Sequence, residues 1–196
     1  RKYTTENYVF ALPSLNISGG IMVAFKHMCT LKKNGYDILI LNDNEDTPWC
    51  EFEGQKFPVL GQNISRFLGK MDHAVATMWT TMEFVQKYYN ISERMYLVQG
   101  YETDLYPAGV HLRGLANRTY MPTGDIQFLT ISRWCQKWLK EKYGQDAAFA
   151  PNGLNFKEFN YVERKLNGKI RILIEGDCAV DYKNVDEAFK VVEFLD

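Results

Sequence analysis

Short apolar runs alternate along the chain with stretches in which apolar residues recur at helical spacing. Short runs that are rich in β-branched and aromatic residues are typical of buried strands. We expect strands at 8–12, 36–41, 73–78, 94–99, 126–131 and 147–150. The stretches between them predict helices at 21–33, 79–89, 109–121 and 132–143, and the turn-rich segment 42–61 predicts a loop with one short hairpin or edge strand. Alternating strands and helices predict βαβ crossovers, and therefore a mostly parallel, doubly wound α/β sheet.

The first strand is followed by a loop that carries a glycine pair, Gly19-Gly20, and then by the first helix. Two adjacent glycines let a backbone approach a ligand closely, and the helix N-terminus behind them presents free N–H groups to an anion. The loop could therefore hold a phosphate or a sugar hydroxyl. The alternative interpretation is that the two glycines only let the chain turn tightly into the helix.

Polar and aromatic residues also follow later predicted strands, and they are Trp79, Thr80, Tyr101, Glu102, Ser132 and Arg133. The carboxyl ends of parallel strands meet at one edge of a sheet, where ligands bind in doubly wound folds. We therefore expect these residues and the glycine pair to share one rim.

Each of these residues could either bind a ligand or have a structural role. The Glu102 carboxylate could hydrogen-bond sugar hydroxyls, and the Tyr101 ring could stack on a pyranose, or both could belong to an exposed loop. Trp79 could line a cleft or fill the core. Ser132 is expected to cap a helix, and Arg133 could meet a phosphate or stay solvated.

A polar linker at about 156–168 separates these elements from a last apolar segment. The run Ile-Arg-Ile-Leu-Ile within 169–175 predicts a fully buried strand. A helix is expected to follow Asn184, because Asn184 and Glu187 have capping-box spacing. One strand and one helix cannot bury their own apolar faces. We therefore expect a domain over 1–160, and over 161–196 a linker with the first βα unit of a truncated second domain.

Composition narrows the classes of function. The 196 residues include 23 Lys and Arg and 24 Asp and Glu, so a net charge of −1 gives no general attraction to nucleic acid. No apolar run approaches the roughly 18–20 residues that cross a bilayer. The four cysteines are scattered, with no C-x-x-C pair and no histidine at metal spacing. We therefore expect a reducing compartment, no metal and no cofactor.

Several short motifs occur in a fixed order along the chain, and they are Ala76-Thr77-Met78-Trp79-Thr80-Thr81, Gln99-Gly100-Tyr101-Glu102, Ile131-Ser132-Arg133-Trp134 and Asn152-Gly153-Leu154-Asn155. With the glycine-pair unit over 9–41 and the segments 170–176 and 183–188, they resemble the N-terminal half of group 1 glycosyltransferases. These enzymes have the GT-B fold, in which two Rossmann-like domains face across a cleft. The sub-branch that looks most similar contains bacterial rhamnosyltransferases of cell-surface polysaccharides. At the position of Asn155, that family often has Asp.

This resemblance implies a Rossmann-like acceptor-side domain of a glycosyltransferase. The enzyme would move a sugar, with rhamnose as one candidate, from a nucleotide-sugar donor such as dTDP-rhamnose to a growing cell-surface glycan, with retention. It would work in the cytoplasm and associate with the inner face of the membrane. The substrate-binding residues implied are Gly19, Gly20, Trp79, Thr80, Tyr101, Glu102 and Arg133.

No catalytic residue is assigned, because positioning and leaving-group stabilisation carry much of such a reaction. The main donor-binding residues of this family lie in the second domain, beyond residue 196. We therefore expect this chain to be inactive on its own.

Other classes of function stay open. A nucleotide- or sugar-binding Rossmann-like module without transfer activity would use the same edge of the sheet. An NAD enzyme needs G-x-G-x-x-G after the first strand and an acid at the end of the second. The stretch 18–21 lacks that glycine pattern, although Asp43 is suitably placed. A purely structural interaction module would leave the strand-end residues without a purpose.

Overall fold

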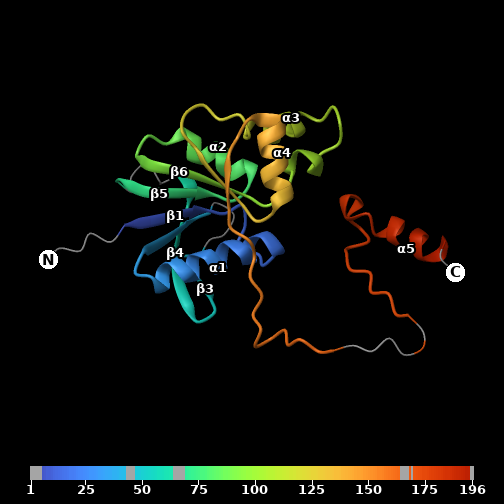
Figure 1. Ribbon diagram of the computed structural model, residues 1–196. Coiled ribbons are helices and arrows are strands. Elements are labelled where there is room, and N and C mark those ends of the chain that lie inside the picture. The colour runs from blue at the N-terminus through green and yellow to red at the C-terminus, as the bar shows by residue number, and fades with distance from the viewer. Residues whose placement is uncertain (1–5, 43–46, 64–68, 164–167, 169, 195–196) are drawn as a thin grey trace. The chain divides into compact units, whose positions relative to one another are not determined.

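The computed structural model describes residues 6–42, 47–63, 69–163, 168 and 170–194, which are drawn as ribbon in Figure 1. The chain divides into two compact units, Arg1–Asn152 and Gly153–Asp196. Each unit is described by itself.

The first unit is built on an eight-stranded sheet in the order β3-β4-β2-β1-β5-β6-β7-β8. All pairings in the sheet are parallel except that of β3 with β4, which forms the expected hairpin at one edge. The mostly parallel, Rossmann-like α/β sheet predicted from the apolar runs is confirmed. Its strands are β1 (Asn7–Ala11), β2 (Asp37–Leu41), β3 (Trp49–Phe52), β4 (Gln55–Leu60), β5 (Met71–Ala76), β6 (Ile91–Val98), β7 (Gln127–Thr130) and β8 (Ala147–Phe149).

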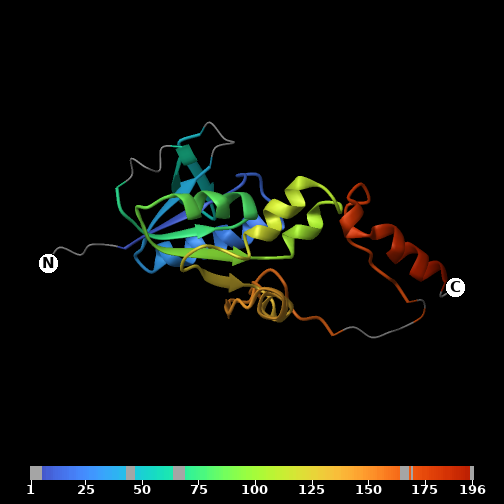
Figure 2. The ribbon, with the colours of Figure 1, turned by 90° about the horizontal axis from the view of Figure 1, so that it is seen from above.

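Helices cover the sheet on both faces, and in the first unit they are α1 (Gly19–Lys33), α2 (Trp79–Lys87), α3 (His111–Arg118) and α4 (Arg133–Tyr143). Figure 1 shows α1 on one side of the sheet and α2 and α4 on the other, and Figure 2 gives the view from above. The reason is topological. The chain leaves β1 in one direction to β2, and β5 in the opposite direction to β6, so right-handed crossovers place the connecting helices on opposite faces.

Each face of the sheet has its own apolar core. On the α1 face, Phe25 is fully buried and stacks on Phe52 with ring centroids 5.0 Å apart. On the other face, Met82 of α2 and Leu139 of α4 are fully buried in one cluster with Tyr96. The sheet is therefore held between two layers of helix, which fixes the positions of the loops at its edges.

The ends of α4 follow local sequence signals. Ser132 is the N-cap, and its hydroxyl accepts a hydrogen bond from the Cys135 N–H at 3.1 Å, as expected from the sequence. Gly144 ends the helix with φ 70°, a left-handed conformation that a residue with a Cβ rarely adopts. The first turn of α4 is thereby fixed directly after β7.

The second unit corrects one prediction. Residues 170–175 form no strand, and Ile170 and Leu173 are 77% and 90% exposed. A strand is stable only when its backbone pairs with a neighbour, and no strand occurs in the described part of this unit. The apolar run is typical of a strand, but the described residues of this unit include no neighbouring strand with which it could pair.

The expected last helix is present as α5 (Val185–Phe194), preceded by a 3₁₀ turn, η3 (Asp181–Lys183). Asn184 has φ 52° and ψ 40°, a left-handed conformation, whereas an N-cap residue is usually extended. Val185 is buried, and a Cβ added to Gly176 would lie 2.5 Å from its Cγ2. The chain therefore needs glycine at 176 to pack against the start of α5.

Candidate functional site at the carboxyl edge of the sheet

The strand order reverses at β1, which lies between β2 and β5. In register, Ala11 at the end of β1 is level with Leu41 on one side and with Ala76 on the other. The helices that follow β1 and β5 leave toward opposite faces of the sheet. This topological switch point is where doubly wound sheets bind ligands.

The backbone at the end of β1 is held by polar side chains from both neighbouring strand ends. The Thr77 hydroxyl, just after β5, donates to the Ala11 carbonyl at 2.9 Å. The Asn42 amide, just after β2, donates to the Leu12 carbonyl at 2.7 Å. Asn42 and Thr77 are both buried. The sequence analysis did not identify either residue as a support, although each is the polar residue directly after an apolar strand.

Replacing Thr77 by valine removes the hydrogen bond to Ala11 while keeping the side-chain shape. We expect Thr77→Val to lower the free energy of unfolding by about 1 kcal/mol, because the carbonyl loses a buried donor. The matched control is Thr80→Val, an exposed position on α2, where the change should stay within about 0.5 kcal/mol. Urea unfolding of the three proteins measures both values, and equal losses in the two variants would contradict the supporting role of Thr77.

The glycine pair lies at the N-terminus of α1, where Ser18 is the N-cap and its side chain accepts from the Ile21 N–H. Neither glycine has a positive φ, so the bend itself does not require glycine. Gly20 instead leaves room for Gln99 at the end of β6: a Cβ on Gly20 would lie 3.2 Å from the Gln99 Nε2, which donates to the Gly20 carbonyl at 3.1 Å. Gly19 is exposed and has no heavy atom within 4 Å of such a Cβ.

Glu102 is in the interior, 8% exposed, in a 3₁₀ turn, η2 (Glu102–Leu105). Its Oε2 accepts hydrogen bonds from the Trp79 N–H at 2.6 Å and from the Tyr96 hydroxyl at 3.0 Å. Trp79 is 5% exposed, and its indole N–H donates to the Tyr106 hydroxyl at 3.0 Å. The structure therefore gives both residues internal partners: Glu102 satisfies the first N–H of α2, and Trp79 packs in the core.

Burial raises the pKa of Glu102 to about 7, because the ionised carboxylate loses its hydration. The hydrogen bonds from the Trp79 N–H and the Tyr96 hydroxyl oppose that rise, since both favour the charged form. Burial also raises the pKa of Tyr96 well above its usual value. The carboxyl group therefore titrates near neutral pH, within a set of hydroxyl groups that stay protonated.

The remaining predicted residues differ in how open they are. Tyr101 is half-buried and directed toward α4, where its hydroxyl lies 2.8 Å from that of Tyr143. Arg133, the first residue of α4, is exposed, with its guanidinium 4.0 Å from the Phe149 ring centroid. Thr80 is exposed on the first turn of α2.

All the predicted residues follow strands that end at the same edge, so the expected shared rim is present. Two direct hydrogen bonds link segments of this rim: one joins Gln99 to Gly20, and the other joins Trp79 to Glu102. Its open members are Gly19, Thr80 and Arg133, with Gly20 half-buried beside them. The NAD-type acid, Asp43, lies outside the described residues.

In the part of the chain that the structure describes, no group of three or more His, Cys, Asp and Glu side chains could hold a metal ion. None of the described helices is both long enough and apolar enough to cross a membrane. Comparison with known proteins adds no name to the site: no protein-family model matches the chain, and no significant match is found among curated proteins.

Proposed function

We propose that the chain is the acceptor-side half of a glycosyltransferase and that the switch point between β1 and β5 receives a nucleotide sugar. The observation that carries this proposal is the exposed Gly19 at the N-terminus of α1, beside the point where the strand order reverses. The motif order that resembles group 1 glycosyltransferases supports the same reading. A rhamnosyl donor such as dTDP-rhamnose and a growing cell-surface glycan are the proposed substrates.

The groups at the edge suit a diphosphate. Free N–H groups in the first turn of α1 and the positive end of its dipole favour phosphate oxygens. Arg133 follows β7, three strand spacings from β1, or about 14 Å. Only an extended ligand contacts both positions, and a nucleotide sugar is of that kind.

The proposed reaction breaks the bond between the anomeric carbon and the diphosphate oxygen, and forms a bond from the same carbon to an acceptor hydroxyl. The diphosphate leaves with the bonding electron pair, and the hydroxyl proton goes to the leaving group or to solvent. Backbone N–H groups of α1 would stabilise the charge that develops on the diphosphate. The proposed location of this reaction is the cytoplasm, at the inner face of the membrane, where a growing cell-surface glycan would be the acceptor.

A sugar- or nucleotide-binding module without transfer activity is the second candidate. The burial of Glu102 favours it, because that carboxylate is engaged by Trp79 and Tyr96 and is therefore not available as a base for a transfer reaction. Such a module would bind the same ligands at the same edge. Release of nucleoside diphosphate by the native protein, dependent on a glycan acceptor, separates the two candidates.

A thermal-shift panel of nucleotide sugars, nucleoside diphosphates and NAD on the complete protein tests the proposal. At a ligand concentration of about 100 times Kd, binding stabilises the folded state by about 2.7 kcal/mol. We expect that stabilisation with a dTDP- or UDP-sugar, and none with NAD at the same concentration. Stabilisation by NAD alone would contradict the proposal and would support the alternative hypothesis of an NAD enzyme.

A further inference from the structure

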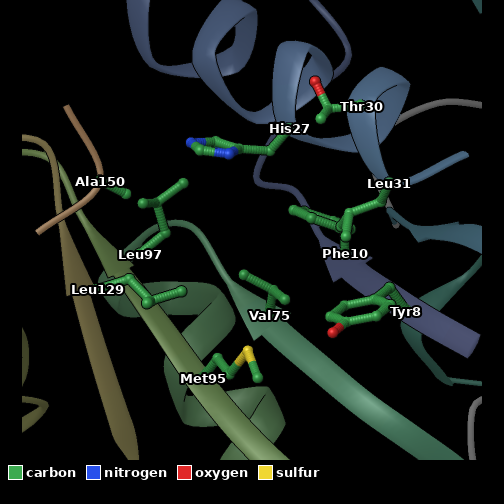
Figure 3. A pocket seen from close by; sticks show the side chains of 10 residues that line it. All are labelled: Tyr8, Phe10, His27, Thr30, Leu31, Val75, Met95, Leu97, Leu129 and Ala150. Atoms are coloured by element: carbon green, nitrogen blue, oxygen red, sulfur yellow. The ribbon is translucent and has the colours of Figure 1, made fainter. Parts of the chain in front are cut away.

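A cavity of ≈ 290 Å³ lies between α1 and the sheet, and none of the residues predicted at the carboxyl edge lines it. Figure 3 shows its floor, formed by side chains from four adjacent strands: Tyr8 and Phe10 of β1, Val75 of β5, Met95 and Leu97 of β6, and Leu129 of β7. His27, Thr30 and Leu31 of α1 border it on the helix side, Ala150 borders it just after β8, and the cavity is partly open to solvent. The lining is therefore almost entirely apolar.

The topology explains why this cavity exists. Parallel sheets are normally covered on both faces. The crossovers after β5 and β7 place α2 and α4 on the opposite face, so α1 is the covering helix on this side in the described part of the first unit. Its buried residues pack on β1, β2 and β4. Space remains over β5, β6 and β7, where Met95 and Leu129 are only half-buried.

Two of the polar side chains that line the cavity, Tyr8 and His27, have no hydrogen-bond partner among the described residues, and His27 is the one that α1 contributes. In Figure 3 the His27 ring extends from α1 toward Ala150 and Leu97. No hydrogen bond or ion pair joins it to any other described residue. Thr30, its neighbour on the helix, is already engaged, because its hydroxyl donates to the Lys26 carbonyl at 2.9 Å. Burial lowers the pKa of His27, so the imidazole is neutral at pH 7 and offers one donor and one acceptor.

These features select a ligand class. A charged group would lose its hydration against apolar walls without a counter-ion, so the ligand is uncharged. An apolar cavity of about 150 Å³ holds benzene, so this one has room for a bicyclic ring or a branched alkyl group. Nucleotides and sugars carry too many polar groups for it.

We propose that this cavity is a binding site for a small uncharged molecule with an aromatic or alkyl body and one hydroxyl group, which hydrogen-bonds to His27. None of the residues predicted at the carboxyl edge lines this site, and it does not depend on the function proposed there.

The test compares the binding of two probes, 2-naphthol and naphthalene, to the 196-residue protein. Methyl NMR measures the binding of each. We expect the methyl resonances of Val75, Met95, Leu97 and Leu129 to shift, with a Kd for 2-naphthol on the order of 10–100 μM. The hydroxyl should make 2-naphthol bind about tenfold tighter than naphthalene. In His27→Phe that preference should disappear while naphthalene still binds.

The second part of the test uses a variant in which a larger side chain fills the cavity. Ala150→Leu places a larger side chain at the border of the cavity, and Ala108→Leu makes the same change at an exposed position elsewhere. We expect at least a tenfold loss of affinity in the first variant and none in the second. Absence of methyl shifts in the wild-type protein, or an equal preference for 2-naphthol in His27→Phe, would overturn the proposal, whether or not Ala150→Leu folds. A dimer that closes this face and excludes both probes would overturn it too.

Discussion

The first unit is expected to lose about 2.5 kcal/mol of unfolding free energy between pH 5 and pH 8 through the titration of Glu102. Its pKa is raised from 4.5 to about 7 in the folded protein, so the folded state holds a proton that the unfolded chain has already released. This contribution is fully present below the unfolded pKa and is lost as the pH rises through the folded one. Stability therefore falls as the solution approaches neutrality.

The variant Glu102→Gln isolates this effect. An amide keeps an oxygen that can accept from the Trp79 N–H and the Tyr96 hydroxyl, and it does not titrate. We expect the variant to be similar to the wild type at pH 5 and more stable than it at pH 8, by about 2–3 kcal/mol. Urea unfolding at the two pH values measures this difference. Parallel pH profiles for the two proteins would contradict the burial of an ionisable carboxyl at this position.

Gly20→Val is expected to weaken nucleotide-sugar binding at least tenfold while leaving the first unit folded. The new Cβ meets only the flexible end of Gln99, at 3.2 Å, so a small movement of that side chain relieves the contact. The added methyl groups would still project at the start of α1, where the ligand phosphate is proposed to approach. Titration calorimetry of the variant with dTDP-rhamnose measures the loss.

Gly114→Val is the matched control, because Gly114 also lies in a helix, α3, and has open space around it. Its position is not part of the proposed site, so its affinity should equal that of the wild type. Equal affinity in Gly20→Val and Gly114→Val would show that the glycine pair serves only the local packing with Gln99.

Local sequence signals were sufficient for most elements of the first unit. A run such as 36–41 is short, apolar and β-branched, and the structure has β2 there. Ser132 and Gly144 mark the ends of α4 because capping depends on one turn of backbone. The rim at the carboxyl edge follows from the order of these elements alone, since consecutive parallel strands end on the same side.

Local sequence signals did not predict the contacts between residues that are far apart in the sequence. Glu102 follows β6 and was expected either to bind a ligand or to lie in an exposed loop. It is buried instead, and its carboxylate accepts a hydrogen bond from the backbone of Trp79, which is 23 residues away. Gln99 reaches Gly20 across 79 residues. The run 170–175 has the composition of a strand, and whether it forms one depends on a partner rather than on its own residues. Such outcomes are decided by tertiary packing, which a single sequence does not display.

The most direct test of the central claim is an amide NMR titration of the protein with dTDP-rhamnose, with NAD as the comparison ligand. The claim predicts that the sugar nucleotide shifts the backbone amide resonances of Gly19, Gly20 and Arg133, and that NAD leaves them unchanged. Binding of the sugar nucleotide with shifts confined to residues away from the carboxyl edge, or shifts of the glycine pair by NAD alone, would contradict it.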